Sequence, residues 1–302
     1  MTTTTTARRP ARPAVRKPFR ILVASDGSPQ ARQAVEAAVA FPWPANAKAT
    51  AVVARAGAPA QWSPPLALQM DAVVREVAEE TKRTLRLRWR DATAVVVDDP
   101  AVDAIVKHAR GCHVVVLGSH GYGRLERWML GSVSRAVVRR ANKTVLVVKG
   151  RGKPYRELLL GFDGSNHARR AVAMVASLSV PRRGRVTLLT FVEPVEAQPP
   201  ALLSGQLRKA YLGEVEALLQ RRTTKARGAL ERAARPLIAA GWRVRYEVRP
   251  GVAARDLVPA AAALGSDVLV VGAQGAGWQR LLLGSVVEAV LDRIPISTLV
   301  VR

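Results

Sequence analysis

Residues 21–35 read ILVASDGSPQARQAV, and residues 158–172 read LLLGFDGSNHARRAV. Eight of these 15 aligned positions are identical, and in both segments a short apolar run precedes Asp-Gly-Ser and a stretch rich in Ala and Arg. The apolar run predicts a buried strand, and the stretch that follows predicts a helix. Such self-similarity indicates an internal duplication of the chain, and this duplication decides the fold.

The duplication continues towards the end of each half. Residues 114–121, VVVLGSHG, correspond to residues 268–275, VLVVGAQG, and each segment is followed by Leu-Gly-Ser-Val and a final apolar strand. We therefore expect two domains, residues 19–150 and residues 151–302, joined by the short turn-rich segment 150–155. A linker this short favours two halves that pack together.

Apolar strands alternate with helical stretches within each half. In the first half we expect strands at residues 21–24, 50–54, 93–97, 113–117 and 144–148. The second half repeats the order with a longer helical stretch over residues 202–239, which Gly213, Gly228 and Pro236 could bend or break. This alternation predicts an α/β fold with a parallel sheet covered on both faces. Such sheets bind ligands outside the carboxyl ends of the strands, where the strand order switches.

The chain is strongly basic, with 47 Lys and Arg against 23 Asp and Glu and a net charge of +24. Residues 1–150 hold 24 basic and 11 acidic residues, and residues 151–302 hold 23 and 12, so both halves carry the excess. Without a nucleic-acid-binding motif, this charge favours only non-specific attraction to nucleic acid or other polyanions. Residues 1–18 hold five basic residues and no acidic one, which predicts a disordered basic tail.

Three features argue against other classes of protein. No apolar run approaches the roughly 20 residues that span a bilayer, so we expect no membrane segment and a cytoplasmic protein. Cys112 is the only cysteine, which rules out an intramolecular disulfide. Cys112 and His113 would point to opposite faces of a strand, with no second ligand cluster, so we expect no metal site there.

The chemistry of the chain is concentrated after the fourth predicted strand. Gly118-Ser-His-Gly121 follows that strand, and nine residues later Gly131-Ser-Val-Ser134 opens a predicted helix. Glycines let the backbone turn sharply and approach a ligand closely. The free N–H groups at a helix start favour an anion, and the hydroxyls of Ser132 and Ser134 can bind phosphate oxygens or a metal. The pattern predicts a triphosphate cradle.

Two other phosphate motifs fit less well, because no Lys follows Gly131 as a P-loop requires, and Glu126 stands where the dinucleotide fingerprint needs its last glycine. Gly-x-x-Gly, nine residues and Gly-Ser resemble instead the ATP-binding signature of the universal stress protein family, as do the ILVASDGS opening and the VLVV close. The resemblance covers nearly all of residues 20–149 and, more loosely, 157–302. It implies two tandem five-stranded parallel-sheet sandwich repeats, adenine-nucleotide α-hydrolase-like, packed as a pseudo-dimer.

The same resemblance implies that the first half binds ATP, with Mg²⁺ alongside. Ala24, Ser25 and Asp26 would line the pocket for adenine and ribose, with Ala54 beside them. The contacts to ribose and phosphates would come from Leu117, Gly118, His120, Gly121, Gly131, Ser132, Val133 and Ser134.

The second half departs from this signature. Eight residues separate Gly275 from Gly284, Val287 stands in place of Ser134, and Gln274 replaces a histidine. A shorter loop and a lost hydroxyl weaken a phosphate cradle, so we expect either a weaker nucleotide site or a packing partner without a ligand. The candidate residues of this half are Asp163, Gly272, Gly275, Gly284 and Ser285.

Three functions remain open on the sequence. The first is a stress-response module that signals through its adenine nucleotide, which could be ATP, AMP or a cyclic nucleotide. The second is a slow ATPase or autophosphorylating enzyme acting at Ser132 or Ser134, but no general base is evident, so we do not expect an enzyme. The third is a nucleic-acid-binding or polyanion-binding protein. The family resemblance also allows further homo-oligomerisation.

Overall fold

The structure of the protein, a computed structural model, describes residues 17–55, 63–121, 130–150, 154–195, 198–199, 204–275 and 283–302. The expected basic tail, residues 1–18, lies outside these ranges except for its last two residues. In the described ranges, no helix is both long enough and apolar enough to cross a membrane.

Both halves fold as alternating strands and helices, as the sequence predicted. The first repeat consists of β1 (Phe19–Ala24), α1 (Pro29–Ala40), β2 (Ala47–Ala54), α2 (Pro64–Arg86), β3 (Thr93–Val97), α3 (Ala101–Ala109), β4 (Val114–Gly118), α4 (Ser132–Arg140) and β5 (Thr144–Val148). The second repeat consists of β6 (Glu157–Gly161), α5 (Asn166–Ser177), β7 (Arg185–Val192), α6 (Gly205–Ala239), β8 (Arg243–Pro250), α7 (Ala253–Ala263), β9 (Val268–Gly272), α8 (Ser285–Arg293) and β10 (Ser297–Val301).

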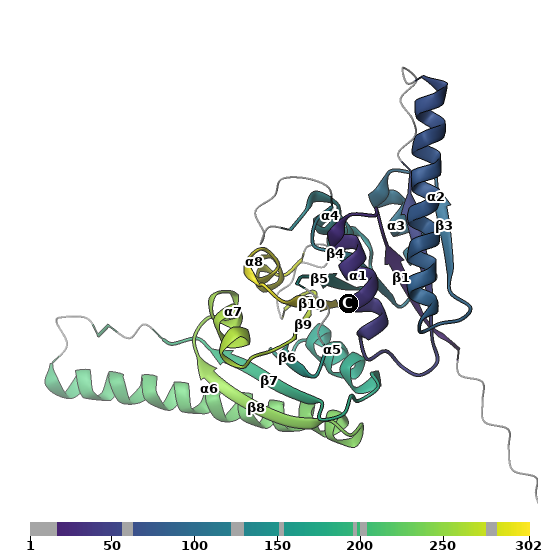
Figure 1. Ribbon diagram of the computed structural model, residues 1–302. Helices are drawn as coiled ribbons and strands as arrows, with labels where there is room; N and C mark the ends of the chain where they lie inside the picture. Colours follow the sequence, from purple (N-terminus) through teal and green to yellow (C-terminus); the bar gives the residue numbers. More distant parts are fainter. Residues whose placement is uncertain are drawn as a thin grey trace, which may run out of the picture.

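The two repeats share one continuous sheet with the strand order β3-β2-β1-β4-β5-β10-β9-β6-β7-β8 (Figure 1). Strands within a repeat pair in parallel, whereas β5 and β10 pair antiparallel, with Leu146 opposite Leu299. The predicted pseudo-dimer is therefore confirmed, and its junction is a strand pair in the middle of the sheet. In each repeat the strand order switches beside the first strand, between β1 and β4 and between β6 and β9.

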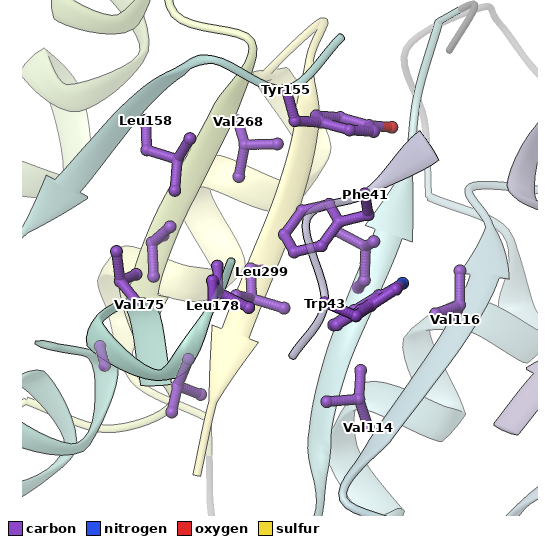
Figure 2. Close-up of a cluster of buried hydrophobic side chains, with 14 of the residues drawn as sticks. Phe41, Trp43, Val114, Val116, Tyr155, Leu158, Val175, Leu178, Val268 and Leu299 are labelled. Carbon is purple, nitrogen blue, oxygen red and sulfur yellow. The ribbon is translucent and has the colours of Figure 1, made fainter. Parts of the chain in front are cut away.

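A hydrophobic layer covers each face of the sheet. Helices α1, α2, α5 and α6 supply one layer, and α3, α4, α7 and α8 supply the other. At the junction of the repeats, Phe41 and Trp43 from the loop after α1 lie beside Leu299 of β10 (Figure 2). The ring of Phe41 is 4.3 Å from that of Trp43 and 5.0 Å from that of Tyr155, centroid to centroid. Buried aromatic contacts therefore join the two repeats in addition to the strand pair.

Ion pairs also link the repeats, between α4 and α8. Arg135 binds Asp292 at 2.6 Å, and Arg139 binds Glu288 at 2.7 Å. The two helices occupy corresponding places in their repeats, and their charges at corresponding positions are opposite. The pairs are partly exposed, so each contributes at most about 1 kcal/mol.

Helix α6 runs unbroken for 35 residues, although the sequence left open that Gly213, Gly228 and Pro236 could bend or break it. Gly213 and Gly228 lie inside it at a cost of about 1 kcal/mol each, and most of their neighbours are good helix formers. Pro236 lies in the last turn, where its carbonyl still accepts a hydrogen bond from Ala240 N. Only the C-terminal part of α6 is buried, and the rest extends past the sheet (Figure 1).

Candidate functional site

A cleft of about 110 Å³ lies at the carboxyl ends of β1 and β4, where the strand order switches. Ten of the twelve residues predicted for the first half line it; Gly131 and Ser132 do not. The lining residues are Ala24, Ser25, Asp26, Ala31, Val52, Ala54, Ala101, Ile105, Leu117, Gly118, His120, Gly121, Val133 and Ser134. The structure thus brings together two sequence segments that are about 90 residues apart.

The Asp-Gly-Ser turn contributes the carboxylate of Asp26 to the lining of this cleft. Asp26 Oδ1 accepts a hydrogen bond from Ser28 N at 2.9 Å, and Ser28 Oγ caps α1 by accepting from Ala31 N at 3.1 Å. Gly27 has φ +77°, a left-handed conformation that glycine adopts without strain. The turn is therefore self-supporting, and it leaves Asp26 Oδ2 outside these bonds.

The Gly-x-x-Gly loop passes close to that turn. A Cβ atom at Gly121 would collide with Oδ2 of Asp26, and one at Gly118 would lie 2.9 Å from the carbonyl oxygen of Gln30 in α1. Both positions therefore require glycine for close packing. Close packing therefore explains why the motif has glycine at both positions. The absence of side chains there lets the loop backbone lie against the carboxylate of Asp26, which lines the cleft.

Helix α4 begins beside the same loop. Its N-cap, Gly131, has no side chain to bond the N–H groups of the first turn, whereas serines cap α1 and α5. Gly131 N donates to Ser119 O at 2.7 Å, which fixes the helix start on the loop. The uncapped N–H groups of α4 can bind an anion at this end of the cleft.

The two serines of α4 lie in different surroundings. Ser132 is exposed at the first helical position, whereas Ser134 is buried and its hydroxyl donates to Gly118 O at 2.7 Å. The hydroxyl proton of Ser134 is therefore used in the hydrogen bond to Gly118 O at the end of β4, although the lone pairs of its oxygen can still accept a hydrogen bond. Its evident structural role is to tie α4 to the glycine loop.

The second repeat has a larger cleft of about 600 Å³ at the carboxyl ends of β6 and β9. All five residues predicted for this half line it, namely Asp163, Gly272, Gly275, Gly284 and Ser285. The turn is built in the same way, because Asp163 Oδ1 accepts from Ser165 N at 2.9 Å and Ser165 Oγ caps α5. Gly284 N donates to Ala273 O at 2.9 Å, as Gly131 N does to Ser119 O.

Several residues of the second cleft were not predicted from the sequence. Phe191 lines its wall at the position that corresponds to Ala54. Ala54 lies two residues after the partner of Ala24 in β2, and Phe191 lies two residues after the partner of Gly161 in β7. Glu288 lines the start of α8, where the first repeat has Arg135, and Val287 is buried where Ser134 lies.

The walls of both clefts also include residues of the helix that follows the third strand. Ala101 and Ile105 of α3 line the first cleft, and Ala253 and Leu257 of α7 line the second. Each pair has the same spacing of four residues at a helix start, and this shared spacing is the sequence signal that could have identified them.

The cysteine and histidine that raised the question of a metal site have other partners. Cys112 Sγ donates to His108 O at 3.6 Å, and burial raises the pKa of its thiol. His113 Nδ1 accepts from Arg20 N at 2.9 Å. Across the described ranges, no three His, Cys, Asp or Glu side chains gather as metal ligands.

The family model described as "Universal stress protein family" matches residues 19–149 and again residues 154–302. The chain therefore belongs to the universal stress protein family, and it contains two tandem copies of the domain. It is similar to universal stress protein Rv2005c of Mycobacterium tuberculosis and Mb2028c of Mycobacterium bovis, with 33% identity over 218 residues in each case. The alignment covers 67% of this chain and only 65% of the length of those relatives.

Solved structures support the fold assignment. A universal stress protein from Archaeoglobus fulgidus superimposes with a TM-score of 0.64 and 18% identity, covering 94% of this chain and 98% of the other. One from Pseudomonas aeruginosa gives a TM-score of 0.56 with 17% identity, covering 93% and 92%. At these identities the likeness shows that the tandem architecture is shared.

Proposed function

We propose that the first cleft binds ATP and that the chain acts as a stress-response module governed by its bound nucleotide. One observation carries this proposal: Asp26, the glycine loop and the uncapped start of α4 converge on a single cleft. A carboxylate can accept hydrogen bonds from ribose hydroxyls or an adenine amino group, and a helix N-terminus attracts phosphate.

The size of the cleft suggests how the nucleotide would lie. A volume of about 110 Å³ is too small for a whole ATP molecule, so the base would fill the apolar part between Val52, Ala54 and Ile105. The triphosphate would extend past His120 to the start of α4. Ser132, exposed at that start, could contribute its hydroxyl to a phosphate or to the Mg²⁺ that accompanies ATP.

We further propose that ATP acts here as a bound signal rather than as a consumed substrate. Among the described residues that line the first cleft, Asp26 and His120 are the titratable groups. Asp26 is held by the Asp-Gly-Ser turn, and His120 Nδ1 lies 3.0 Å from Ser119 Oγ. Among the described residues neither is paired with a carboxylate or a second imidazole that would activate it as a general base for phosphoryl transfer, so turnover would be slow.

The second cleft is a further candidate nucleotide site because of its volume and the aromatic wall at Phe191. An aromatic ring can stack on a purine base. The phosphate end is less favourable, since Glu288 places a carboxylate near the start of α8 that is only partly offset by its ion pair with Arg139. We propose that this cleft binds the nucleoside part of an adenine nucleotide and discriminates against a triphosphate.

Mass spectrometry of nucleotide released from protein purified without added ligand tests these proposals. We expect an adenine nucleotide, and the ratio of nucleotide to chain distinguishes one occupied cleft from two. Isothermal titration of nucleotide-stripped protein with ATP gives the affinity. If the purified protein carried no nucleotide and millimolar ATP gave no saturable heat, the proposal would be wrong.

A further inference from the structure

A second kind of groove lies at the junction of the repeats, away from both clefts. It has a volume of about 460 Å³ and is formed where the start of β5 meets the end of β10, with α5 alongside. Its charged side chains are Lys143 of the first repeat and Arg170 and Arg302 of the second. None of these residues lines either nucleotide cleft.

The duplication supplies a natural comparison for this groove. Its pseudo-symmetric counterpart, of about 350 Å³, is lined by Lys149 and Asp267, which correspond to Arg302 and His113. Asp267 accepts hydrogen bonds from Arg156 N and Glu157 N, both at 2.9 Å, whereas the bond that His113 accepts among the described residues comes from Arg20 N. The groove near Arg302 thus has an imidazole where its counterpart has a carboxylate.

Arg302 itself is unusual among the basic residues. Its Nη2 donates to the carbonyl oxygens of Val138 and Arg139, both at 2.9 Å, and so caps the end of α4. Its Nε is buried and has no hydrogen-bond partner among the described residues, and burial lowers the pKa of the guanidinium. A buried donor on a charged group costs free energy unless an acceptor reaches it.

The neighbouring cations have no ion-pair partner in the described part of the chain. Within the described ranges, no carboxylate forms an ion pair with Lys143, Arg170 or Arg302. Arg170 and Arg302 lie close enough to His167 to act on it electrostatically: burial first, and then these two guanidinium groups, lower the pKa of its imidazole, whereas Asp163 opposes the shift. Three cationic side chains therefore border one open groove, and none of them forms an ion pair in the part of the chain that the structure describes.

We propose that this groove binds a phosphate group among the cationic side chains of Arg302, Arg170 and Lys143, with a shift of the Arg302 side chain that turns its unpartnered Nε–H towards the anion. A guanidinium group presents N–H donors in a plane that matches two oxygens of a phosphate, and a dianion balances the excess positive charge. Because Lys143 belongs to one repeat and the two arginines to the other, the bound anion would bridge the repeats and stabilise their pairing.

The test is a titration of the full chain with inorganic phosphate, replacing chloride at constant ionic strength. The readout is the ¹⁵N–¹H resonance of the Arg302 side-chain Nε, which a phosphate bound at the start of α4 or α8 would not contact. We expect a saturable shift of this resonance and a parallel rise in the midpoint of thermal unfolding. A parallel titration with glycerol 2-phosphate distinguishes a phosphomonoester ligand from the free ion.

Two variants and a matched control sharpen the result. Lys143→Gln combined with Arg170→Gln should weaken phosphate binding at least tenfold, and Lys143→Gln alone should weaken it severalfold. The control combines Arg221→Gln with Arg222→Gln, the same loss of charge on exposed positions of α6, and should change affinity less than twofold. A shift that rises linearly without saturation, or an equal loss in the control, would overturn the proposal.

Discussion

The two clefts of the chain share an Asp-Gly-Ser turn and a glycine at the start of a helix. The first cleft, however, keeps the residues suited to phosphate, and the second keeps the space suited to a base. The first has about 110 Å³ and keeps the serine and the loop length of the phosphate signature. The second has about 600 Å³, with Phe191 on its wall, but carries Val287 and Glu288 at the phosphate end. The sequence signature therefore describes the phosphate end of a nucleotide site, whereas the cleft volume describes the space for the base. Neither feature alone says which of the two clefts binds a nucleotide more tightly.

The largest expected effect on the free energy of unfolding comes from replacing Ser134 by valine, the residue that the second repeat has at the corresponding position. Ser134→Val removes the 2.7 Å hydrogen bond to Gly118 O and should lower the free energy of unfolding by about 2 kcal/mol. ATP affinity should fall with it, because α4 is no longer tied to the loop. Urea unfolding and ATP titration measure the two effects.

The matched control is Ser132→Val, which makes the same chemical change at an exposed serine two residues earlier. It should change the unfolding free energy by less than about 0.5 kcal/mol. Equal losses in both variants would mean that the hydrogen bond of Ser134 contributes nothing specific to the first repeat.

Corresponding glycines at the starts of α4 and α8 should respond differently to the same substitution. A Cβ at Gly131 would lie 3.0 Å from the His120 Cα, whereas one at Gly284 would meet its nearest atom, Gly275 N, at 3.4 Å. Gly131→Ala should therefore displace the loop and weaken ATP binding at least tenfold, about 1.4 kcal/mol, in calorimetric titration.

Gly284→Ala is its control and should change ATP affinity by less than about threefold. If Gly284→Ala removed most of the ATP binding and Gly131→Ala little of it, the second cleft would be the principal ATP site, and our assignment of the two clefts would be reversed.

The residues that follow the last strand of each repeat should give the repeats different responses to pH. Lys149 donates to the carbonyl oxygens of Leu291 and Ile294 and so caps α8, as Arg302 caps α4. Burial lowers the pKa of Lys149 to about 8, with Asp292 opposing the shift and Arg135 adding to it. The guanidinium of Arg302 stays charged at any pH at which proteins are studied.

The sign of this effect follows from proton binding. Between about pH 8 and the usual lysine pKa of 10.5, the unfolded chain holds a proton on Lys149 that the folded chain has released, so stability rises with pH. From pH 7 to pH 9 the wild-type unfolding free energy should gain about 1 kcal/mol relative to Lys149→Met. Parallel curves for the two proteins in urea unfolding would contradict the assignment.

The smallest effect concerns charge at the second cleft. Glu288→Gln removes a partly exposed carboxylate that lines the cleft and releases Arg139 from its ion pair, so ATP affinity there should rise by about threefold. Adenosine, which carries no phosphate, should bind equally well before and after the change. An equal gain for both ligands would show that the residue acts through the shape of the cleft rather than through its charge.

Much of the architecture follows from the sequence because it depends on local patterns. The alternation of strands and helices, the Asp-Gly-Ser turn and the glycine loop are each encoded within a few adjacent residues. The position of β10 in the centre of the sheet follows from the family resemblance rather than from any local pattern. The sequence left open whether α6 continues through Gly213 and Gly228; it does, because a single glycine lowers helix stability by only about 1 kcal/mol, which the rest of a long helix offsets.

The details of the site were harder to predict, since they depend on contacts between distant segments. The sequence indicated that Ser134 could bind phosphate, but only the folded chain shows its proton committed to Gly118 O. Similarly, Phe191 becomes a wall residue through the register of β7 against β6, and no motif marks it. Cleft volumes arise from such side chains, so a signature of glycines and serines could not rank the two sites by size.

The strand pair at the centre of the sheet has a consequence for synthesis on the ribosome. The first repeat is translated first, and β5 has no partner strand from the second repeat until β10, about 150 residues later, has been translated. A nascent neighbour could pair with the edge of β5. In such an encounter the arrangement of α4 against α8 would place Arg135 of one chain against Arg139 of the other, where the mature protein has Asp292 and Glu288. Repulsion between these arginines would keep the edge available for its own chain.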